Sequence, residues 1–467
     1  MRVRITPHCF SGDIKIPASK SHTVRQLFIA SLANGVSNLF YPLDSLDTRS
    51  CVNTCAAFGA KIKECYVIDS SGNSPCPNQP NEKGEKLIKW EIKGNGGFKT
   101  KGVRKVKEGY MLQLDVGNSG TTLFFALAAA GLQDKPIIFT GDKQIQKRSA
   151  APLLDALAGL GIHCRSDNGC APITIKGPWK GGKVKLPCPT SQYLSALLIA
   201  APLAPAGAVT EIDVPLLNEK PYIDMTLSYL KAHSIPFEAA PDYSRFVIPG
   251  GSSWKKILHD ITYGSVPGDF SSAAFPAAAA AISGGSVTIF RLDPNDTQGD
   301  KFFMEILSSM GCNVQWYDSA IDSDKSRALV ISRGGVLRGG TFDLNATPDL
   351  LPVTAAVAAY AQGDTSLVNI AHARIKETDR IAAMANELAK SGVSCTELPD
   401  GLIIHGKGGL SPPEKNCIID GHGDHRIVMA FAAAALGSPV PVEITTAECA
   451  AATYPGFLDL LGAEWLD

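Results

Sequence analysis

The chain has 467 residues, of which 45% are hydrophobic and 19% are charged, and its formal net charge is −1. This composition is that of an ordinary globular protein, and the near-zero charge argues against broad binding of nucleic acids or other polyanions. A chain of this length is expected to fold as two domains rather than one.

Neither the first residues nor the apolar runs indicate export or a membrane. Residues 1–7 alternate like a strand and lack the apolar core of a secretory signal. The longest alanine-rich runs carry Pro, Ser or Gly, which is typical of buried helices rather than membrane spans. The 12 cysteines are scattered and include no CxxC pair, which favours a reducing compartment. We therefore expect a cytoplasmic protein that binds no membrane.

The stretch from Ser19 to Gly35 predicts a helix that follows a small polar turn. A serine can cap its start, and the glycine can end it in the left-handed conformation. Lys20 and Arg25 lie near the positive end of the helix dipole, where an anion is favoured. Taken alone, this pattern also fits a solvated surface helix.

The same pattern, a polar or glycine turn before an apolar alanine-rich helix, recurs along the chain at intervals of about 75 to 80 residues. The later turns begin at Gly117, Thr190, Gly268, Pro348 and Gly423. A second helix is expected after each first one, over residues 47–59, 151–161, 222–233, 300–311, 377–392 and 455–462. Short strand-like segments follow most of them. The chain is therefore predicted to contain six α/β repeats with buried first helices, whose N-termini could point into one cleft.

Polar segments separate these repeats. Residues 66–86 predict an exposed loop, the basic run from Lys99 to Lys107 predicts a solvated loop, and residues 319–327 predict another. Residues 254–263 indicate a crossing between two halves, because the repeat pattern restarts at Gly264.

Five charges lie between Arg374 and Arg380 at a predicted helix start. Lys376 and Arg380 would be i,i+4 neighbours on one face, with Glu377 beside them. Together with Asp349 they could combine acid/base groups with anion clamps, although a solvated helix start is the simpler interpretation. The loop residue Arg148 is similarly either a surface charge or a fork for phosphate or carboxylate.

The sequence gives little support for a metal site, a nucleotide-binding loop or a serine hydrolase. Two histidines with one aspartate near Gly423 are weak evidence for a metal site, so we expect none. The sequence contains no Walker A, GxGxxG or GxSxG motif.

Together these stretches resemble the 5-enolpyruvylshikimate-3-phosphate synthase family, the 3-phosphoshikimate 1-carboxyvinyltransferases, over nearly the whole chain. Each motif alone is weak, whereas the set in this order and spacing is specific. The motifs are Pro17–Ser21 with Arg25, Gly117–Thr121, Arg148, Thr190–Gln192, Lys220–Ile223, Pro348–Asp349, Lys376–Arg380 and Asp424–Arg426.

The resemblance implies an α/β, two-lobed enolpyruvyl transferase fold with three repeats in each lobe and a two-crossover hinge. Residues 19–263 would form one lobe, mainly on the shikimate 3-phosphate side. Residues 1–18 and 264–467 would form the other, with the catalytic Asp/Glu pair and the phosphoenolpyruvate arginines. We expect a monomer that needs no metal or organic cofactor.

Enzymes of this family transfer the enolpyruvyl group of phosphoenolpyruvate to the 5-hydroxyl of shikimate 3-phosphate. The reaction passes through a tetrahedral intermediate and releases phosphate. By resemblance, Asp349 would accept the hydroxyl proton, Glu377 would protonate the methylene carbon, and Lys20 would shuttle a proton. The shikimate 3-phosphate ligands would be Lys20, Ser21, Arg25, Thr190, Ser191, Gln192, Asp349 and Lys376. The phosphoenolpyruvate ligands would be Lys20, Gly120, Arg148, Gln192, Arg380 and Arg426.

The chain departs from the family pattern at four positions. Leu123-Phe124 stands where an arginine usually follows the glycine turn, and His372 stands where an asparagine is frequent. Glu219 replaces a serine that helps to bind the substrate phosphate, which it should repel unless it points away. Ala452 replaces a lysine that clamps the phosphoenolpyruvate carboxylate. Because one charge-assisted contact contributes about 1.5–3 kcal/mol, we expect a divergent member with weakened anion binding.

Two other functions stay open at this point. The first is an enolpyruvyl transferase with another acceptor, such as the UDP-N-acetylglucosamine enzyme, although residues 141–148 lack the reactive cysteine of that enzyme. The second is a non-catalytic binding protein of the same fold. Glu219 and Ala452 favour it, whereas the retention of Lys20, Asp349 and Glu377 does not.

Overall fold

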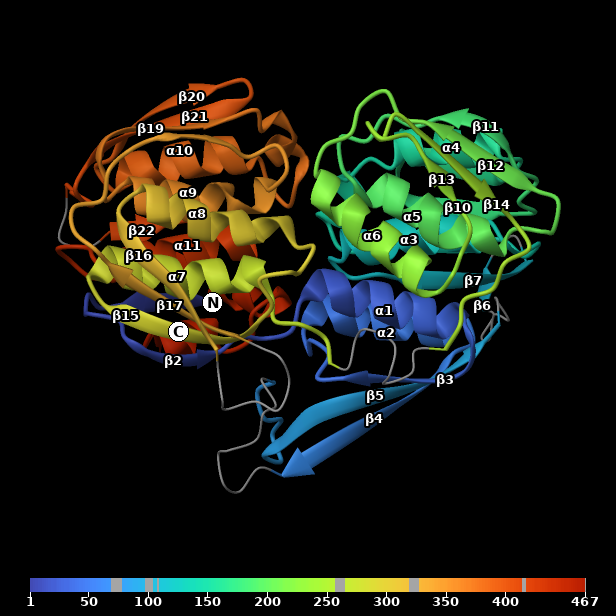
Figure 1. Cartoon of the computed structure of the whole chain (residues 1–467), viewed down its shortest axis with the longest axis horizontal. Helices are drawn as coiled ribbons and strands as arrows, with labels where there is room; N and C mark the ends of the chain where they lie inside the picture. Colours follow the sequence, from blue (N-terminus) through green and yellow to red (C-terminus); the bar gives the residue numbers. More distant parts are fainter. Residues whose placement is uncertain are drawn as a thin grey trace. The chain divides into compact units, whose positions relative to one another are not determined.

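The computed structural model describes residues 1–68, 78–96, 104–106, 109–256, 265–318, 327–413 and 417–466. The chain divides into two compact units. Unit 1 consists of Met1–Ser19 and Pro267–Asp467, and unit 2 consists of Lys20–Val266. In Figure 1 the colours run from the blue N-terminus to the red C-terminus, so that unit 1 combines the first strands with the yellow-to-red half of the chain. Which substrate each unit binds stays a prediction.

The described part of unit 2 contains three pairs of helices and three small sheets. The helices are α1 (Lys20–Leu32), α2 (Leu46–Ala57), α3 (Gly120–Ala130), α4 (Ala151–Gly159), α5 (Gln192–Ala200) and α6 (Lys220–Ala232), with short 3-10 turns η1 (Ile145–Lys147) and η2 (Ala201–Leu203). The strands are β3 (Asn34–Phe40), β4 (Lys61–Ile68), β5 (Glu85–Asn95), β6 (Arg104–Val106), β7 (Gly109–Asp115), β8 (Ile137–Thr140), β9 (His163–Asp167), β10 (Cys170–Lys176), β11 (Gly182–Lys185), β12 (Val209–Asp213), β13 (Glu238–Ala239) and β14 (Arg245–Pro249). Their sheet orders are β3-β5-β4, β6-β7-β8-β10-β9 and β11-β12-β14-β13.

The described part of unit 1 repeats this plan. Its helices are α7 (Phe270–Ser283), α8 (Phe302–Ser309), α9 (Leu351–Ala358), α10 (Arg380–Lys390), α11 (His425–Ala435) and α12 (Phe457–Leu460), with 3-10 turns η3 (Gly299–Lys301), η4 (Pro348–Leu350), η5 (Ala371–Ile375) and η6 (Ala447–Ala452). Its strands are β1 (Arg2–Ile5), β2 (Gly12–Lys15), β15 (Ser286–Leu292), β16 (Cys312–Asp318), β17 (Arg327–Arg333), β18 (Thr341–Asp343), β19 (Gln362–Val368), β20 (Ser394–Leu398), β21 (Gly401–Lys407), β22 (Cys417–Ile419), β23 (Val442–Thr445) and β24 (Glu464–Leu466). The sheet orders are β22-β23-β1-β24, β16-β17-β15-β2 and β18-β19-β21-β20.

These six small sheets confirm the predicted α/β fold of six repeats. The strands that complete two of the unit 1 sheets come from the start of the chain. β1 pairs antiparallel with both β23 and β24, and β2 pairs parallel with β15. The N-terminal residues are therefore an integral part of unit 1.

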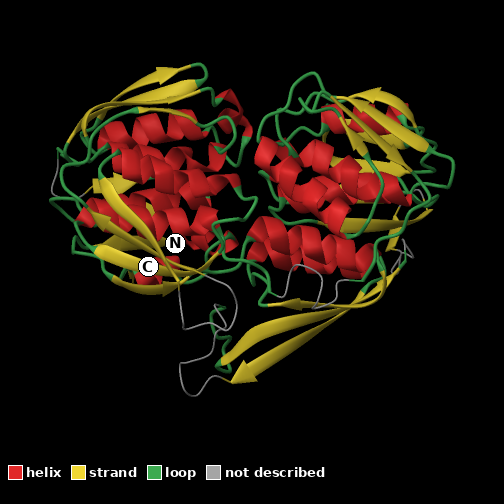
Figure 2. Ribbon diagram, in the orientation of Figure 1, coloured by secondary structure: helices red, strands yellow, loops and turns green. Residues whose placement is uncertain are grey.

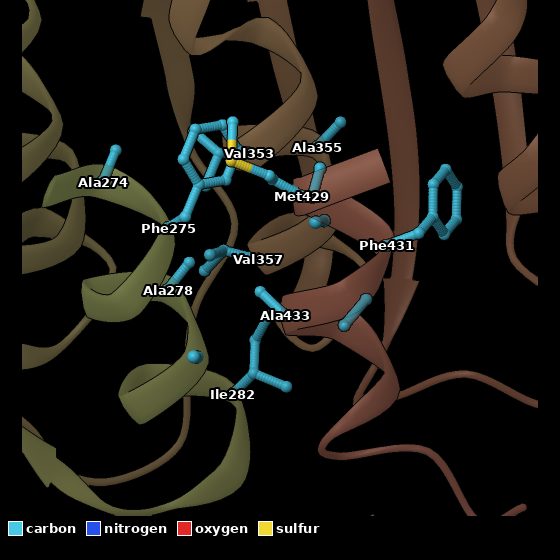
Figure 3. Packing of buried hydrophobic residues seen from close by; sticks show 14 of the residues in the cluster. Ala274, Phe275, Ala278, Ile282, Val353, Ala355, Val357, Met429, Phe431 and Ala433 are labelled. Atoms are coloured by element: carbon cyan, nitrogen blue, oxygen red, sulfur yellow. The ribbon is translucent and has the colours of Figure 1, made fainter. Parts of the chain in front are cut away.

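Within each unit the helices lie inside and the sheets lie around them (Figure 2). The alanine-rich helices have no polar face because they are enclosed on all sides. Figure 3 shows α7, α9 and α11 packed through Ala278, Val357 and Ala433, which are all 0% exposed. Small side chains at these positions let the helix backbones approach closely, and the larger Phe275 and Met429 fill the space beside them. This packing fixes where each helix N-terminus, and thus each candidate site residue, lies.

Two local predictions are wrong. Helix α1 ends at Leu32, because the next residues enter β3, where Gly35 pairs with Gly94 of β5. Helix α10 begins at Arg380 rather than at residue 377, because the Asp379 side chain caps it by accepting a hydrogen bond from Ala382 N at 3.0 Å. Lys376 therefore precedes the helix, and the predicted i,i+4 face with Arg380 does not exist.

The predicted loops coincide largely with segments outside the described residues. Residues 69–77 of the first loop lie outside, but its ends belong to β4 and β5. Only residues 104–106 of the basic run are described, and they form β6. Residues 257–263 of the crossing and 319–326 of the last loop also lie outside. Among the helices that the structure does describe, none is long and apolar enough to cross a membrane.

Candidate active site

The centre of the unit 1 site is Arg380, the first residue of α10, whose side chain is 1% exposed. Its Nη1 donates to Asp349 Oδ1 at 2.8 Å, and its Nη2 donates to Glu377 Oε2 at 2.6 Å. Its Nε donates to Asp424 Oδ2, also at 2.8 Å. Asp349 lies in η4, and Asp424 caps the N-terminus of α11. One buried guanidinium group thus joins the starts of three helical elements.

Asp349 lies between two guanidinium groups. Besides Arg380, Arg426 of α11 donates from Nη2 to Asp349 Oδ2 at 2.7 Å. Burial opposes the ionisation of Asp349, but the cations around it, Arg426 foremost, hold its pKa well below the usual range. Lys376 is one of these cations, although it lies before α10. Asp349 is therefore an ionised carboxylate at neutral pH, with its basicity suppressed by its partners.

A further carboxyl group of this site, Asp300, is not among the residues that the sequence predicts. It is 1% exposed, it accepts a hydrogen bond from Ser271 Oγ, and its Oδ1 has no hydrogen-bond partner among the described residues. Burial, together with the charge of Asp349, raises the pKa of Asp300 to about 7. The available signal is the polar turn Gly299-Asp300, which resembles the turn Gly268-Asp269 but by itself predicts only a helix start. Two carboxyl groups with pKa values displaced in opposite directions are typical of acid/base sites.

In unit 2 the start of α3 approaches a loop arginine. A Cβ atom placed on Gly120 would lie 2.5 Å from Arg148 Nη1 and 3.6 Å from Gln192 Oε1. Only glycine therefore admits Arg148 at this distance. Tyr193 Oη donates to the carbonyl of Ser149 at 2.6 Å, which holds the loop that carries Arg148. The structure thus brings together three of the predicted phosphoenolpyruvate ligands, Gly120, Arg148 and Gln192.

The predicted ligands on α1 are already engaged with protein groups. Lys20 Nζ forms an ion pair with Asp47 Oδ2 at 3.0 Å. Arg25 is 2% exposed and donates from Nε to Thr226 Oγ1 at 3.0 Å and from Nη1 to the carbonyl of Ser21 at 3.2 Å. Burial lowers the pKa of Arg25 to about 10, so the group stays a cation at neutral pH.

Glu219 does not point away from the predicted phosphate ligands. Its Oε2 accepts hydrogen bonds from Thr190 Oγ1 at 3.1 Å, from Ser191 N at 2.9 Å and from Ser191 Oγ at 2.7 Å. The N-terminus of α5 thus holds a carboxylate of the chain itself. The sequence identified Glu219 as a departure but could not give its direction.

Two of the three remaining departures, Phe124 and Ala452, place an uncharged side chain where the family resemblance predicts a cation. Phe124 is 3% exposed and packs edge-to-face on Tyr193, with ring centroids 4.9 Å apart. His372 Nε2 lies 3.1 Å from the carbonyl oxygen of Asn345. Ala452 ends η6. Neither Phe124 nor Ala452 can supply the cation that the resemblance predicts at its position.

Acidic and basic side chains at the starts of tightly packed helices define a class of enzyme that binds anionic substrates and moves protons between them. Among the described residues, no cluster of His, Cys, Asp and Glu is arranged to hold a metal ion. Whether the clusters of unit 1 and unit 2 face one gap stays a prediction.

Comparison with known proteins identifies the family. The protein-family model for EPSP synthase (3-phosphoshikimate 1-carboxyvinyltransferase) matches residues 6–88 and 84–461 of this chain. The 3-phosphoshikimate 1-carboxyvinyltransferase of Acetivibrio thermocellus is 41% identical over 99% of this chain and 97% of its own. The protein of the same name from Ruminiclostridium cellulolyticum is 39% identical over 98% and 97%. A solved structure of EPSP synthase from Acinetobacter baumannii matches with a TM-score of 0.74 and 26% identity over 99% of each chain. The chain therefore belongs to the EPSP synthase family.

Proposed function

We propose that the chain performs the reaction of its family with the two clusters described above. Its activity is that of a 3-phosphoshikimate 1-carboxyvinyltransferase of the shikimate pathway, with phosphoenolpyruvate and shikimate 3-phosphate as substrates. This assignment replaces both alternatives left open by the sequence, another acceptor and a non-catalytic protein. The observation that carries the residue-level proposal is Asp349, held between Arg380 and Arg426 in a chain that matches the family along nearly its whole length.

In unit 1, Arg380 and Arg426 bind phosphoenolpyruvate, and Asp349 accepts the proton of the 5-hydroxyl. Asp349 is a weak base while both guanidinium groups donate to it. An anionic substrate that draws hydrogen bonds from these arginines weakens their hold on Asp349, so that its pKa rises as the substrate arrives. Binding of phosphoenolpyruvate thereby prepares the base for the hydroxyl of shikimate 3-phosphate.

Glu377, in its protonated form, donates the proton to the methylene carbon of phosphoenolpyruvate and becomes a carboxylate. Its hydrogen bond to Arg380 at 2.6 Å keeps it near the same guanidinium group as Asp349. Lys376 and Asp349 contact shikimate 3-phosphate. A base and an acid that share one arginine can act on two substrates that meet beside it.

In unit 2, shikimate 3-phosphate is held by Lys20, Ser21, Arg25, Thr190, Ser191 and Gln192. Phosphoenolpyruvate is held by Lys20, Gly120, Arg148 and Gln192. Helix N-termini and fixed cations offset the repulsion between two multiply charged anions. Lys20, which the Asp47 carboxylate holds in place, contacts both substrates and shuttles a proton.

The enzyme works in the cytoplasm as a monomer without metal or organic cofactor. Light scattering of the purified protein should give the mass of one chain, and a dimer mass would contradict the monomer. Turnover should persist in EDTA, because no step of the proposal uses a metal ion.

A direct assay tests the function. The protein is mixed with millimolar phosphoenolpyruvate and shikimate 3-phosphate, and phosphate release is followed over time. Release that requires both substrates is the expected result. A folded protein that releases no phosphate would remove the proposal.

A further inference from the structure

Glu219 is buried in unit 2 directly before α6, and its side chain carries a charge that the family serine lacks. The residue is 2% exposed. Its backbone has φ of 60° and ψ of 41°, a left-handed conformation that is uncommon for a residue other than glycine. Such strain persists only where the surrounding contacts hold it in place.

The segment before Glu219 is tied to the segment that leads into α5. Asn218 N donates to the carbonyl of Cys188 at 3.1 Å, and Cys188 N donates to the carbonyl of Leu216 at 2.8 Å. Asn218 Nδ2 also reaches the carbonyl of Pro189 at 3.4 Å. These contacts hold the backbone of Glu219 beside the start of α5, so that its carboxylate reaches Thr190 and Ser191.

Three of the donors that meet this carboxylate are two hydroxyl groups and one backbone amide at a helix N-terminus. A hydroxyl group has a single proton to donate. While Thr190 and Ser191 donate to Glu219, their hydroxyl protons are not available to a ligand. The proposed function, on which this inference rests, assigns the same two residues to the bound shikimate 3-phosphate.

We propose that Glu219 sets the affinity and selectivity for the acceptor by competing with its phosphate group for the donors of Thr190 and Ser191. The phosphate binds as the carboxylate gives up these hydrogen bonds and moves away. Each acceptor molecule must therefore displace an anion of the protein before its own anion is bound. An acceptor without a phosphate does not need these donors, so Glu219 lowers the preference of this chain for phosphorylated over unphosphorylated shikimate.

The test measures binding of shikimate 3-phosphate and of shikimate by calorimetry. Glu219→Ser restores the hydroxyl group of the family, and Glu219→Gln keeps the size of the side chain but removes its charge. The matched control is Glu238→Gln, which changes an exposed glutamate on β13 of the same unit. We expect Glu219→Ser to bind shikimate 3-phosphate about tenfold more tightly than the wild type, the effect of one charge-assisted hydrogen bond. Glu219→Gln should shift the affinity in the same direction, while shikimate binding stays within about twofold.

Two results would overturn the competition. One is that neither Glu219 variant binds shikimate 3-phosphate more tightly than the control. The other is that shikimate binding tightens by the same factor, because a purely structural effect would act on both ligands alike. If Glu219→Ser does not fold, the near-isosteric Glu219→Gln decides. Phosphate release by the wild type is measured in parallel. If either contrary binding result is found while the wild type turns over, only the proposed competition is wrong. A folded wild type without turnover overturns the proposed function and this inference together.

Discussion

Asp349 accepts a hydrogen bond from Arg380 at 2.8 Å and another from Arg426 at 2.7 Å. The same two arginines are the proposed phosphoenolpyruvate ligands, so the state of the base depends on what else the arginines bind. A carboxylate held in this way is ionised at neutral pH. It can act as a base only when the two arginines donate their hydrogen bonds to another anion. Under the proposed function, the same charge pairing that keeps Asp349 ionised also controls when Asp349 can act as a base.

Replacing Asp349 by Asn should abolish turnover and leave shikimate 3-phosphate binding measurable by calorimetry. The amide keeps the shape of the side chain but cannot accept the hydroxyl proton, and positioned bases contribute roughly 10²–10⁴-fold to the rate. Asp364→Asn, at an exposed carboxylate of β19 in the same unit, is the control. A variant that no longer folds would make Asp349 a structural residue instead.

The raised pKa of Asp300 predicts a pH-dependent stability. In the folded chain this pKa is about 7, against 3.8 for an ordinary aspartate. Between these values the folded state retains a proton that the unfolded state releases, so the stabilisation present below about pH 4 is lost as the pH rises to about 7. Asp300→Asn does not titrate and should escape this loss.

Chemical denaturation of the wild type and of Asp300→Asn at several pH values measures the effect. The advantage of the variant in free energy of unfolding should grow from about pH 4 to pH 7 and then level off. Asp293→Asn, at a nearby exposed aspartate, should show no such trend. An advantage that is the same at every pH would contradict the assignment of the proton to Asp300.

At the scale of elements, the start of α10 determines the direction of Arg380. Asp379 caps the helix and also forms an ion pair with Arg374 at 2.8 Å. Asp379→Ala should lower the free energy of unfolding by about 1 kcal/mol, the usual effect of a lost N-cap. It should also raise the KM for phosphoenolpyruvate, because Arg380 is the first residue that the cap orders.

Asp379→Asn is the matched variant, because asparagine caps helices as well as aspartate does. It should keep most of the stability and the wild-type KM. Denaturant titration and initial-rate kinetics distinguish the two variants. If alanine and asparagine behaved alike, the ion pair with Arg374 would be the important contact and the cap would not.

The elements also explain which features the sequence could predict. Apolar periodicity and polar turns depend on neighbouring residues, so the six repeats and most helices follow from the sequence. The start of α10 could not be predicted, because Asp379 and the residues before it offer competing capping positions. The direction of Glu219 and the pKa of Asp300 depend on partners about 30 and 50 residues away, at Ser191 and Asp349, and no local pattern encodes them.

At the scale of the whole molecule, each unit has a hydrophobic core of its own. The buried cluster around α7, α9 and α11 contains only residues of unit 1, and the cluster around α1, α3 and α5 contains only residues of unit 2. Each unit is therefore expected to have its own free energy of unfolding, so that a core mutation in one unit leaves the stability of the other unchanged.

Phe275→Ala tests this separation. Phe275 is 0% exposed in the unit 1 core, and truncating it should destabilise that unit by about 3–5 kcal/mol. Hydrogen exchange read by mass spectrometry should accelerate in peptides of α7, α9 and α11 and stay unchanged in peptides of α1, α3 and α5. Equal acceleration in both sets would show that the two cores unfold as one.

The pairing of β1 has a consequence for how the protein is made. This strand is translated before the whole of unit 2, yet it lies between β23 and β24, and its Arg2 pairs with Thr445 of β23 and Leu466 of β24. At ordinary rates of translation these partners emerge tens of seconds later. The nascent chain must therefore keep the apolar side chains of Val3 and Ile5 from aggregating while the whole of unit 2 is synthesised. The residues of β1 are therefore translated before unit 2 but can complete their sheet only after unit 2 has been made.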